Sequence, residues 1–439
     1  MARVYQQSLF SWKDVEDLGD LERLKLVVES MPDQKLIEVL YQKRGRGRKD
    51  HPVEALWNSL LAGVVFQHKS IESLRRELKR NAQLRELCGF NVVKGAEAVP
   101  SKSAYTRFLK NLLLNEALID EIFNALVSAL EKLLPEFGTN LAGDSKAIHS
   151  AAKKTARQEG DQRGEQDADF GKKTYRGTKE DGTPWVKVRS WFGFKLHLVV
   201  DADYELPVAM SVTKASVSDV SEMKPLMAKL AQEHSSIVRG CEHFMGDKGY
   251  DSTELISWLW KEHEIKAVID IRNMWQDGDR TRNLPSGRYG NMTYDHRGGI
   301  FCHCPKTNEV KPMVHGGFDK KREALKYSCP MMAKGVECKG ACNCPLRGGV
   351  RIKLAEDRRV FTAVARSSYK WKNLYDKRTS VERVNSRVAT SFGLEKHYIR
   401  GLAKMKMRCS LALCVMLAVA VGRIEQGQQE KMRSLVQAA

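Results

Sequence analysis

The chain lacks the features that carry a protein into or across a membrane. Its first residues, MARVYQQSLFSWKDVEDLGD, have no basic head followed by a long apolar run, so we see no secretory signal. The most apolar stretch, 409–422, is shorter than the ~20 residues that span a bilayer, which favours a buried core helix. We therefore predict a cytoplasmic protein with no membrane partner. Its ten cysteines should be thiols or metal ligands rather than disulfides.

Acidic residues are scarce relative to basic ones. Lys and Arg number 73 against 54 Asp and Glu, which gives a net charge of +19. A surplus of this size favours a polyanionic partner, with nucleic acid first and an acidic membrane second. The alternative is an ordinary basic protein. The 439 residues also allow two or three domains, and we find no internal repeats.

Helical periodicity dominates residues 1–136. Segments such as DLERLKLVVESM and PVEALWNSLLAGVVFQ place apolar residues at three-to-four spacing, and serine caps precede later segments. A basic loop, QKRGRGRKDHP, separates two of these helices and offers Arg44, Arg46 and Arg48 as DNA contacts. We predict an all-helical DNA-binding domain. A plain bundle with solvated basic side chains is the alternative.

Strands and helices alternate from residue 137 to 272. Two strands surround the polar turn DADYEL, and the polar segment 152–185 before them is expected to be an exposed, partly disordered loop. The full order predicts an α/β fold with a mixed sheet of the ribonuclease-H type. Its expected elements are a strand at 139–150, the two strands within 188–216, a helix at 219–233, a strand at 242–247, a helix at 252–263 and a strand at 265–272. We expect residues 351–439 to complete this core with helices at 369–393 and 402–424.

Two aspartates end candidate strands of this sheet. If the strands are neighbours, Asp144 and Asp247 meet at one edge, where α/β sheets place their chemistry. Asp247 could instead be a helix cap or turn former. Two-metal phosphoryl transfer requires a third acid, and the helix 369–390 offers Glu382. Tyr375 and Arg378 share its helix face, although Arg378 and Glu382 could be a plain surface ion pair.

The segments LAGDSKAIHS, FMGDKGYDS and YDKRTSVER together resemble the DDE transposases of bacterial insertion sequences. More narrowly, they are similar to the branch whose last acid lies in a Tyr-x2-Arg-x3-Glu-x6-Lys helix. The N-terminal RGRGRKDHP…LRELCGF…VPSKSAYTRFLKNL resembles the helical domain that precedes the core of many such enzymes. The similarity covers most of residues 35–425, with the three motifs in the right order.

The resemblance implies roles for the motif residues. Asp144, Asp247 and Glu382 would bind two Mg²⁺ ions, which Mn²⁺ could replace, and Tyr375 and Arg378 would contact phosphates. The partners would be double-stranded DNA, as terminal inverted repeats and target, and a second subunit in a homodimer on paired ends. The enzyme would work in the bacterial cytoplasm, on chromosomal or plasmid DNA. Its reaction would cut each end by hydrolysis, and the freed 3′-hydroxyl would attack target DNA.

Some positions depart from this pattern or add to it. The family lysine falls at Ala389, and the nearby Arg383 and Arg387 lie off that helix face. Asp219 resembles a further family acid, although a helix N-cap is its plainer interpretation. Lys195 and His197 share one strand face and could contact DNA. For the histidine, a structural role is the more common one.

Six cysteines cluster in residues 302–344, within a segment, 273–350, that we interpret as an insertion into the α/β domain. Clustered cytosolic cysteines favour a structural zinc site, with His303 and His315 as spare ligands. Free thiols and an iron–sulfur cluster are the alternatives. The candidate ligands are Cys302, Cys304, Cys329, Cys338, Cys342 and Cys344.

These observations lead us to predict a metal-dependent DNA transposase. Two alternatives stay open: a transposase-derived DNA-binding protein without catalysis, and a ribonuclease-H-like nuclease. The presence of all three acids argues against the first alternative. Terminal inverted repeats flanking the gene would argue against the second.

Overall fold

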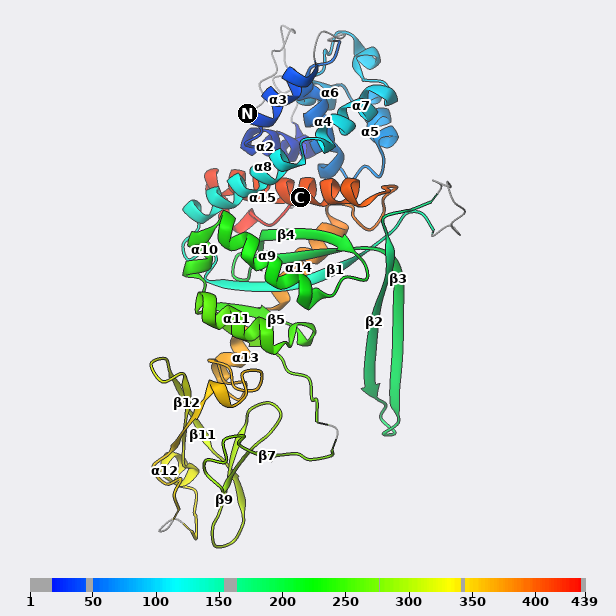
Figure 1. Ribbon diagram of the computed structural model, residues 1–439. Helices are drawn as coiled ribbons and strands as arrows, with labels where there is room; N and C mark the ends of the chain where they lie inside the picture. Colours follow the sequence, from blue (N-terminus) through cyan, green and yellow to red (C-terminus); the bar gives the residue numbers. More distant parts are fainter. Residues whose placement is uncertain (1–17, 45–49, 154–163, 276, 341–343, 436–439) are drawn as a thin grey trace.

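The structure is a computed structural model that describes residues 18–44, 50–153, 164–275, 277–340 and 344–435. Helices lie at one end, a mixed sheet in the middle, and small sheets at the other end (Figure 1). A two-stranded ribbon projects beside the middle part.

The N-terminal part is helical, as predicted. Ser70 and Ser101 cap two of its helices, because each hydroxyl oxygen accepts a hydrogen bond from the backbone N–H three residues on. Arg44 ends α3, and its guanidinium donates to the carbonyl of His51, whereas Arg46 and Arg48 lie outside the described residues. The helices are α2 (Glu22–Ser30), α3 (Gln34–Arg44), α4 (Val53–Val65), α5 (Ile71–Arg80), α6 (Ala82–Cys88), α7 (Lys102–Leu113) and α8 (Glu116–Leu133).

The central sheet is mixed, as the order of elements predicts. Its core runs β4-β3-β1-β5-β6, in which the first three strands are antiparallel and the last two parallel to β1. Helices α9 (Asp219–Glu233) and α11 (Thr253–His263) connect its later strands. The strands are β1 (Asn140–His149), β3 (Pro184–Asp201), β4 (Leu206–Lys214), β5 (His243–Gly246) and β6 (Lys266–Ile269).

The predicted loop at 152–185 is partly wrong. Residues 154–163 lie outside the described part, but Asp169–Thr178 form strand β2, which pairs with the outer half of β3. The polar sequence GKKTYRGT gives β2 no apolar face, and β2 is held by backbone hydrogen bonds to its neighbour instead. Such a strand has no periodic hydrophobic signal in the sequence.

Residues 273–353 form two small antiparallel sheets. The segment has a buried apolar cluster that extends into the residues following it. Met292, Ile300, Leu325 and Ile352 belong to a buried cluster that continues to Phe361. The strands are β7 (Arg282–Asn283), β8 (Met292–Tyr294), β9 (Ile300–His303), β10 (Val310–Pro312), β11 (Val314–Asp319), β12 (Ala324–Ser328) and β13 (Val350–Lys353), with the short helix α12 (Pro330–Lys334).

The helix predicted at 369–393 is two helices. α13 (Tyr369–Asp376) and α14 (Thr379–Thr390) are joined by a tighter turn, in which the N–H groups of Lys377 and Arg378 bond three residues back. The backbone of Lys377 and Arg378 keeps right-handed helical torsion angles.

The last long helix, α15 (Leu402–Glu425), is longer than its apolar run suggests. It is long and apolar enough to cross a membrane, yet 89% of its most apolar window is buried inside the protein. It packs against α8, α2 and α4 on one side and β4 on the other. One continuous hydrophobic core therefore runs from the N-terminal helices through α15 to the sheet.

Candidate active site

Asp144 and Asp247 lie side by side because of the strand register. β1 and β5 are parallel, and their pairing ends at Gly143 opposite Gly246. The next residue of each strand is an aspartate, so the two carboxylates occupy matching positions at the same edge. Asp144 itself lies within β1, because that strand continues against β3 to His149.

Asp144 is held in a confined, acidic environment. Burial raises the pKa of its carboxyl to about 6, and the charges of Asp247 and Asp219 add to that effect, whereas Lys173 opposes it. The amide of Asn385, on α14, donates to Asp144 Oδ2 at 3.2 Å. Three acids thus lie within electrostatic range of one another.

Asp247 also acts as a helix cap, which was the alternative interpretation of this residue. Its Oδ1 accepts a hydrogen bond from Gly249 N at 2.6 Å and caps the short 3₁₀ turn η3 (Lys248–Tyr250). The ring of Tyr250 is buried beneath the acids. Burial and the charges of Asp144, Asp219 and Asp247 together raise its pKa well above the usual value.

Buried Lys195 and half-buried Asp219 form an ion pair next to this cluster. Ser218 is the N-cap of α9, so Asp219 is its first residue and is not the cap. Lys195 Nζ lies 2.9 Å from Asp219 Oδ1 and donates to the carbonyl of Val217. We expected Lys195 and His197 to be able to face DNA, but both are buried. Burial also lowers the pKa of His197 to about 4.

Tyr375, Arg378 and Glu382 form a chain of contacts across the α13–α14 turn. Arg378 lies over the Tyr375 ring, 5.4 Å from its centroid, and its guanidinium lies 2.5 Å from Glu382 Oε1. The ring of Trp371 stacks on Tyr375. Glu382 is on the same face of α14 as Asn385, one turn before it. The ion pair considered as the plain alternative therefore exists.

The position of the family lysine is buried. Ala389 is 3% exposed, so this site has no room for a long charged side chain. Arg383 and Arg387 both pair with Glu205, and Arg433 joins them. Neither arginine is available to replace the lysine while that pairing holds.

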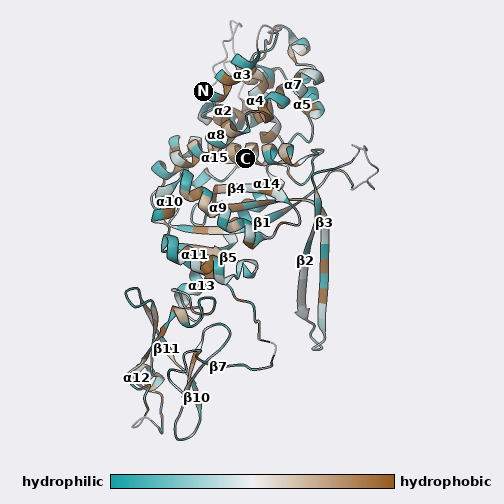
Figure 2. Ribbon diagram, viewed as in Figure 1, coloured by the Kyte–Doolittle hydropathy of each residue, from teal (hydrophilic) through white to brown (hydrophobic). Residues whose placement is uncertain are grey.

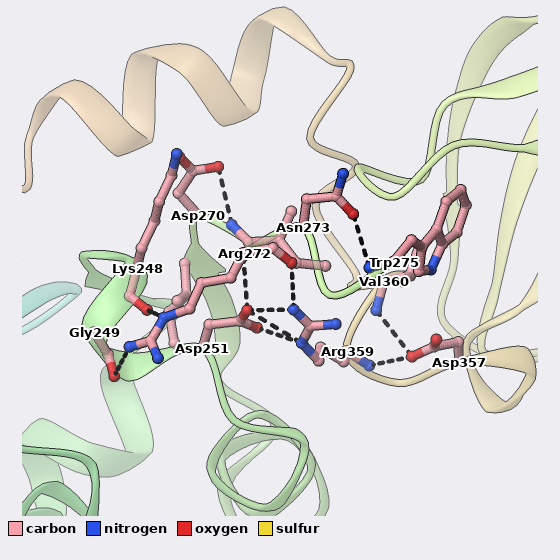
Figure 3. Close-up of polar contacts among 12 residues, drawn as sticks. Lys248, Gly249, Asp251, Asp270, Arg272, Asn273, Trp275, Asp357, Arg359 and Val360 are labelled. Carbon is pink, nitrogen blue, oxygen red and sulfur yellow. Dashed lines mark hydrogen bonds and ion pairs between the residues drawn. The ribbon is translucent and has the colours of Figure 1, made fainter. Parts of the chain in front are cut away.

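A polar network fixes the turn after Asp247 (Figure 3). The buried carboxylate of Asp251 accepts from Arg359 Nη2 at 2.7 Å and from the N–H of Arg272 at 2.8 Å. The Arg272 guanidinium in turn donates to the carbonyls of Lys248 and Gly249. Asp251 lies within the quoted FMGDKGYDS segment, but no role was predicted for it from the sequence, and no motif includes Arg272 or Arg359.

Metal-binding geometry is not assembled in the part of the chain that the structure describes. No three His, Cys, Asp or Glu side chains there lie close enough to hold an ion. Glu382 in particular is directed to Arg378. Half-buried carboxylates that lie together at one sheet edge nevertheless suit a hard cation, which would neutralise their mutual repulsion.

The described candidate cysteines converge on one narrow cavity. Asn291 donates to Cys344 Sγ at 3.8 Å, and the thiols of Cys304 and Cys338 share a hydrogen bond. Hydrogen bonds from Thr307 and from backbone N–H groups lower the pKa of Cys304 to about 7. Cys342 lies outside the described residues. The cavity is lined by Cys302, Cys304, Cys329, Cys338 and Cys344, together with His303.

Comparisons with known proteins bear on this arrangement. The chain matches the family model "Transposase DDE domain" over residues 154–418, and "Transposase domain (DUF772)" over residues 10–111. The first match includes Asp247 and Glu382 and begins after Asp144. No curated protein matches the chain significantly. Among solved structures, a piggyBac transposase synaptic complex with hairpin DNA is 12% identical, with a TM-score of 0.37, over 95% of this chain and 79% of that one.

The longer match covers more than half of the chain, and the chain therefore belongs to the transposase DDE domain family. Enzymes of this class use divalent metal ions for phosphoryl transfer on DNA. The protein is thus a metal-dependent DNA transposase. Neither match favours a DNA-binding protein without catalysis or a nuclease.

Proposed function

We propose that the protein moves a bacterial insertion sequence by cutting at its terminal inverted repeats and joining the freed ends to target DNA. The observation that carries this proposal is the β1–β5 register, which sets Asp144 and Asp247 at matching positions of one sheet edge. The motif resemblance supports the Tyr-x2-Arg-x3-Glu branch, with Ala389 as the departure. The partners are double-stranded DNA and a second subunit on the paired ends, in the bacterial cytoplasm.

Asp144, Asp247 and Glu382 are the proposed ligands of Mg²⁺. When bound, two Mg²⁺ ions would activate the attacking oxygen and stabilise the leaving oxygen of the phosphate. Asp144 and Asp247 supply neighbouring carboxylates from the sheet. Glu382 has to exchange its contact with Arg378 for the metal, which a side-chain rotation on the exposed face of α14 allows.

Arg378 and Tyr375 are the proposed contacts to the phosphate beside the cut. Arg378 is placed between the Tyr375 ring and Glu382, and its charge is felt at Asp247. When Glu382 leaves it, the guanidinium is free to donate to phosphate oxygens. The same movement therefore supplies a ligand and a phosphate contact.

A structural zinc ion is proposed for the cysteine cavity. Thiolates are the preferred ligands of structural zinc, and four ligands suffice. Cysteines separated by up to 42 residues line this one cavity, and Cys304 has a pKa near neutrality. The zinc would join the 302–304 strand end to the 329–344 segment.

Metal analysis tests this zinc proposal. The purified protein should contain about one zinc per chain, and Cys329→Ser should lose it. Cys409→Ala, a substitution in the buried core helix α15, should retain the metal. Equal zinc content in the two variants, or none in the wild type, would remove zinc from the proposal.

The domain division remains part of the proposal. Residues 1–136 would recognise DNA, 137–272 and 351–439 would form the catalytic core, and 273–350 would be the cysteine-rich insertion. The two small sheets of the last segment support its assignment. Because one hydrophobic core runs through α15, we expect the DNA-recognition region and the catalytic core to move as one rigid body.

Cleavage of a labelled duplex tests the function. The duplex carries the inverted repeat that flanks the gene, and the wild type is compared with Asp247→Asn in Mg²⁺ and in EDTA. Asp279→Asn, at an exposed position distant in sequence from the acids, is the matched control. We expect metal-dependent nicking at the repeat boundary, lost only in Asp247→Asn while binding persists.

Two results would contradict the proposed function. Tight binding without nicking in any divalent metal would favour a DNA-binding protein. Preferential hydrolysis of RNA–DNA hybrids would favour a nuclease.

A further inference from the structure

Strand β2 and the outer half of β3 form an arm, residues 169–193, that stands clear of the body of the molecule (Figure 1). The two strands pair without interruption from Asp169 opposite Gly193 to Thr178 opposite Pro184. All side chains from 184 to 190 are exposed. An isolated two-stranded ribbon contributes little to the stability of a fold, so stability does not explain the length of this arm.

The register gives the arm two different faces. Lys173 lies opposite Arg189, and Lys187 is two residues further along β3, so these three cations share one face, here called the basic face. The other face carries Val186 and Val188, together with Lys172. Figure 2 shows the resulting alternation of hydrophilic and hydrophobic residues along β3.

Two tryptophans belong to the basic face and lie at its two ends. The Trp185 ring covers Gly177 so closely that a Cβ there would be 2.6 Å from it, and Trp191 covers Gly171 in the same way, at 2.4 Å. Both rings therefore lie flat along the ribbon. Lys173, Lys187 and Arg189 occupy register positions between the two tryptophans.

The cations of the basic face do not stabilise the fold through ion pairs with the described residues. Among the described residues, Lys173, Lys187 and Arg189 form no ion pair, although many other basic residues do. The whole arm contains six Lys and Arg residues and three Asp and Glu residues. Lys173 is near enough to Asp144 for its charge to act on that carboxylate. The basic face therefore begins beside the acid cluster.

The inner end of the arm is firmly connected to the site. β3 continues from the arm into the central sheet as the neighbour of β1, without leaving its strand. Asp169 fixes the base of β2, because its carboxylate accepts hydrogen bonds from Ser216, just after β4. A molecule bound along the arm is thus held in a fixed position relative to Asp144.

We propose that the arm is a DNA-binding element whose basic face contacts the backbone of the duplex next to the phosphate that is cut. This inference rests on the proposed function for the place of the cut. The major groove of B-DNA, ~12 Å wide, admits a two-stranded β-ribbon. Unpaired Lys and Arg in a row supply the phosphate contacts. The excess of positive charge favours DNA over a second copy of the chain as the occupant.

A charge-matched pair of variants tests the arm. Arg189→Gln removes one charge from the basic face, and Lys172→Gln removes one charge from the opposite face, at the neighbouring register position. Binding of the labelled repeat duplex is measured between 50 and 300 mM salt. We expect Arg189→Gln to weaken binding roughly five- to tenfold and to lower the salt slope by about 1, and the double variant Lys187→Gln/Arg189→Gln by about 2. Lys172→Gln should stay within about twofold of the wild type.

Several outcomes would overturn the inference. Equal losses in Arg189→Gln and Lys172→Gln would mean that only net charge matters, and no loss in either would mean that the arm does not touch DNA. If Arg189→Gln changes the molar mass of the oligomer in light scattering but leaves DNA binding unchanged, the arm is a contact between subunits. The test is separate from catalysis: if the wild type binds through the arm but never nicks, the proposed function fails and the arm stands. If the wild type nicks the duplex, and Arg189→Gln binds and nicks it as well as the wild type does, only the arm inference fails.

Discussion

Asn385 shows how a residue outside every motif enters the site. It follows Glu382 by one helical turn and donates to Asp144 across the gap between α14 and β1. Its own Oδ1 is buried and has no hydrogen-bond partner among the described residues. The side chain therefore orients one carboxylate and leaves an acceptor in the site that a bound water or substrate group can satisfy.

We predict that Asn385→Ala lowers metal-dependent nicking by about tenfold, because a hydrogen bond to a charged acceptor contributes roughly 1.5–3 kcal/mol. Single-turnover nicking should also require more Mg²⁺ than in the wild type. Thr390→Ala, exposed on the same helix, is the control and should behave as the wild type. An unchanged Mg²⁺ dependence in Asn385→Ala would show that Asp144 does not need this contact.

His243, at the start of β5, gives a pH-dependent prediction. Burial, with Lys370 and Lys266 nearby, lowers its pKa to about 4, so the folded protein keeps it neutral while the unfolded chain protonates it near pH 6.5. Its contribution to stability is complete above pH 6.5 and is lost as the pH falls toward 4. Between pH 7.5 and 5.0 the wild type should lose about 2 kcal/mol more than His243→Gln in urea unfolding. Parallel losses would mean that His243 is accessible to protons.

Among the elements, β1 and β2 show what the sequence can and cannot predict. The apolar run before Asp144 marks β1 as a strand, and the same pattern marks β5 before Asp247. The register that brings the acids together depends on strand pairing, which neither segment encodes alone. β2 was missed because pairing with β3, and not an apolar face, makes it a strand. The partners of Asp251 come from residues up to 108 positions away, beyond the reach of any local pattern.

The network around Asp251 connects the turn after Asp247 to the segment before α13 (Figure 3). Arg359→Ala leaves a carboxylate that is 1% exposed without its cation, so we predict a loss of about 3 kcal/mol in the free energy of unfolding. The exposed pair Lys320–Glu264 is the control, and Lys320→Ala should cost less than about 1 kcal/mol.

A double variant separates charge from packing at this network. Asp251→Asn/Arg359→Met removes both charges and should be more stable than Arg359→Ala. If Arg359→Ala costs no more than the exposed control, the network does not hold the turn.

In the molecule as a whole, helix α15 joins the N-terminal helices to the central sheet. Its buried side chains contact the N-terminal helices on one side and the sheet on the other, so the two regions share one apolar interior. A boundary near residue 136 marks a change of secondary structure and does not separate two cores. This also explains why a helix of membrane-spanning length is buried here.

We predict that a fragment of residues 137–439 does not fold on its own. Removing the helices exposes the apolar side of α15, which includes Leu411 and otherwise packs against them. Circular dichroism and binding of an apolar dye should report a loosely packed, aggregating fragment, whereas the full chain unfolds cooperatively. A soluble fragment with a sharp thermal transition would show that the sheet needs no helical cover.

The rigid continuation of β3 into the arm has a consequence for where the DNA is cut. The ten residues of β2 extend ~33 Å, close to one turn of B-DNA at ~34 Å. The fixed length of the arm would therefore set the number of base pairs between its outermost DNA contact and the bond that is cut. Shortening both strands by two residues would then leave the chemistry intact and relax the choice of the outermost base pairs.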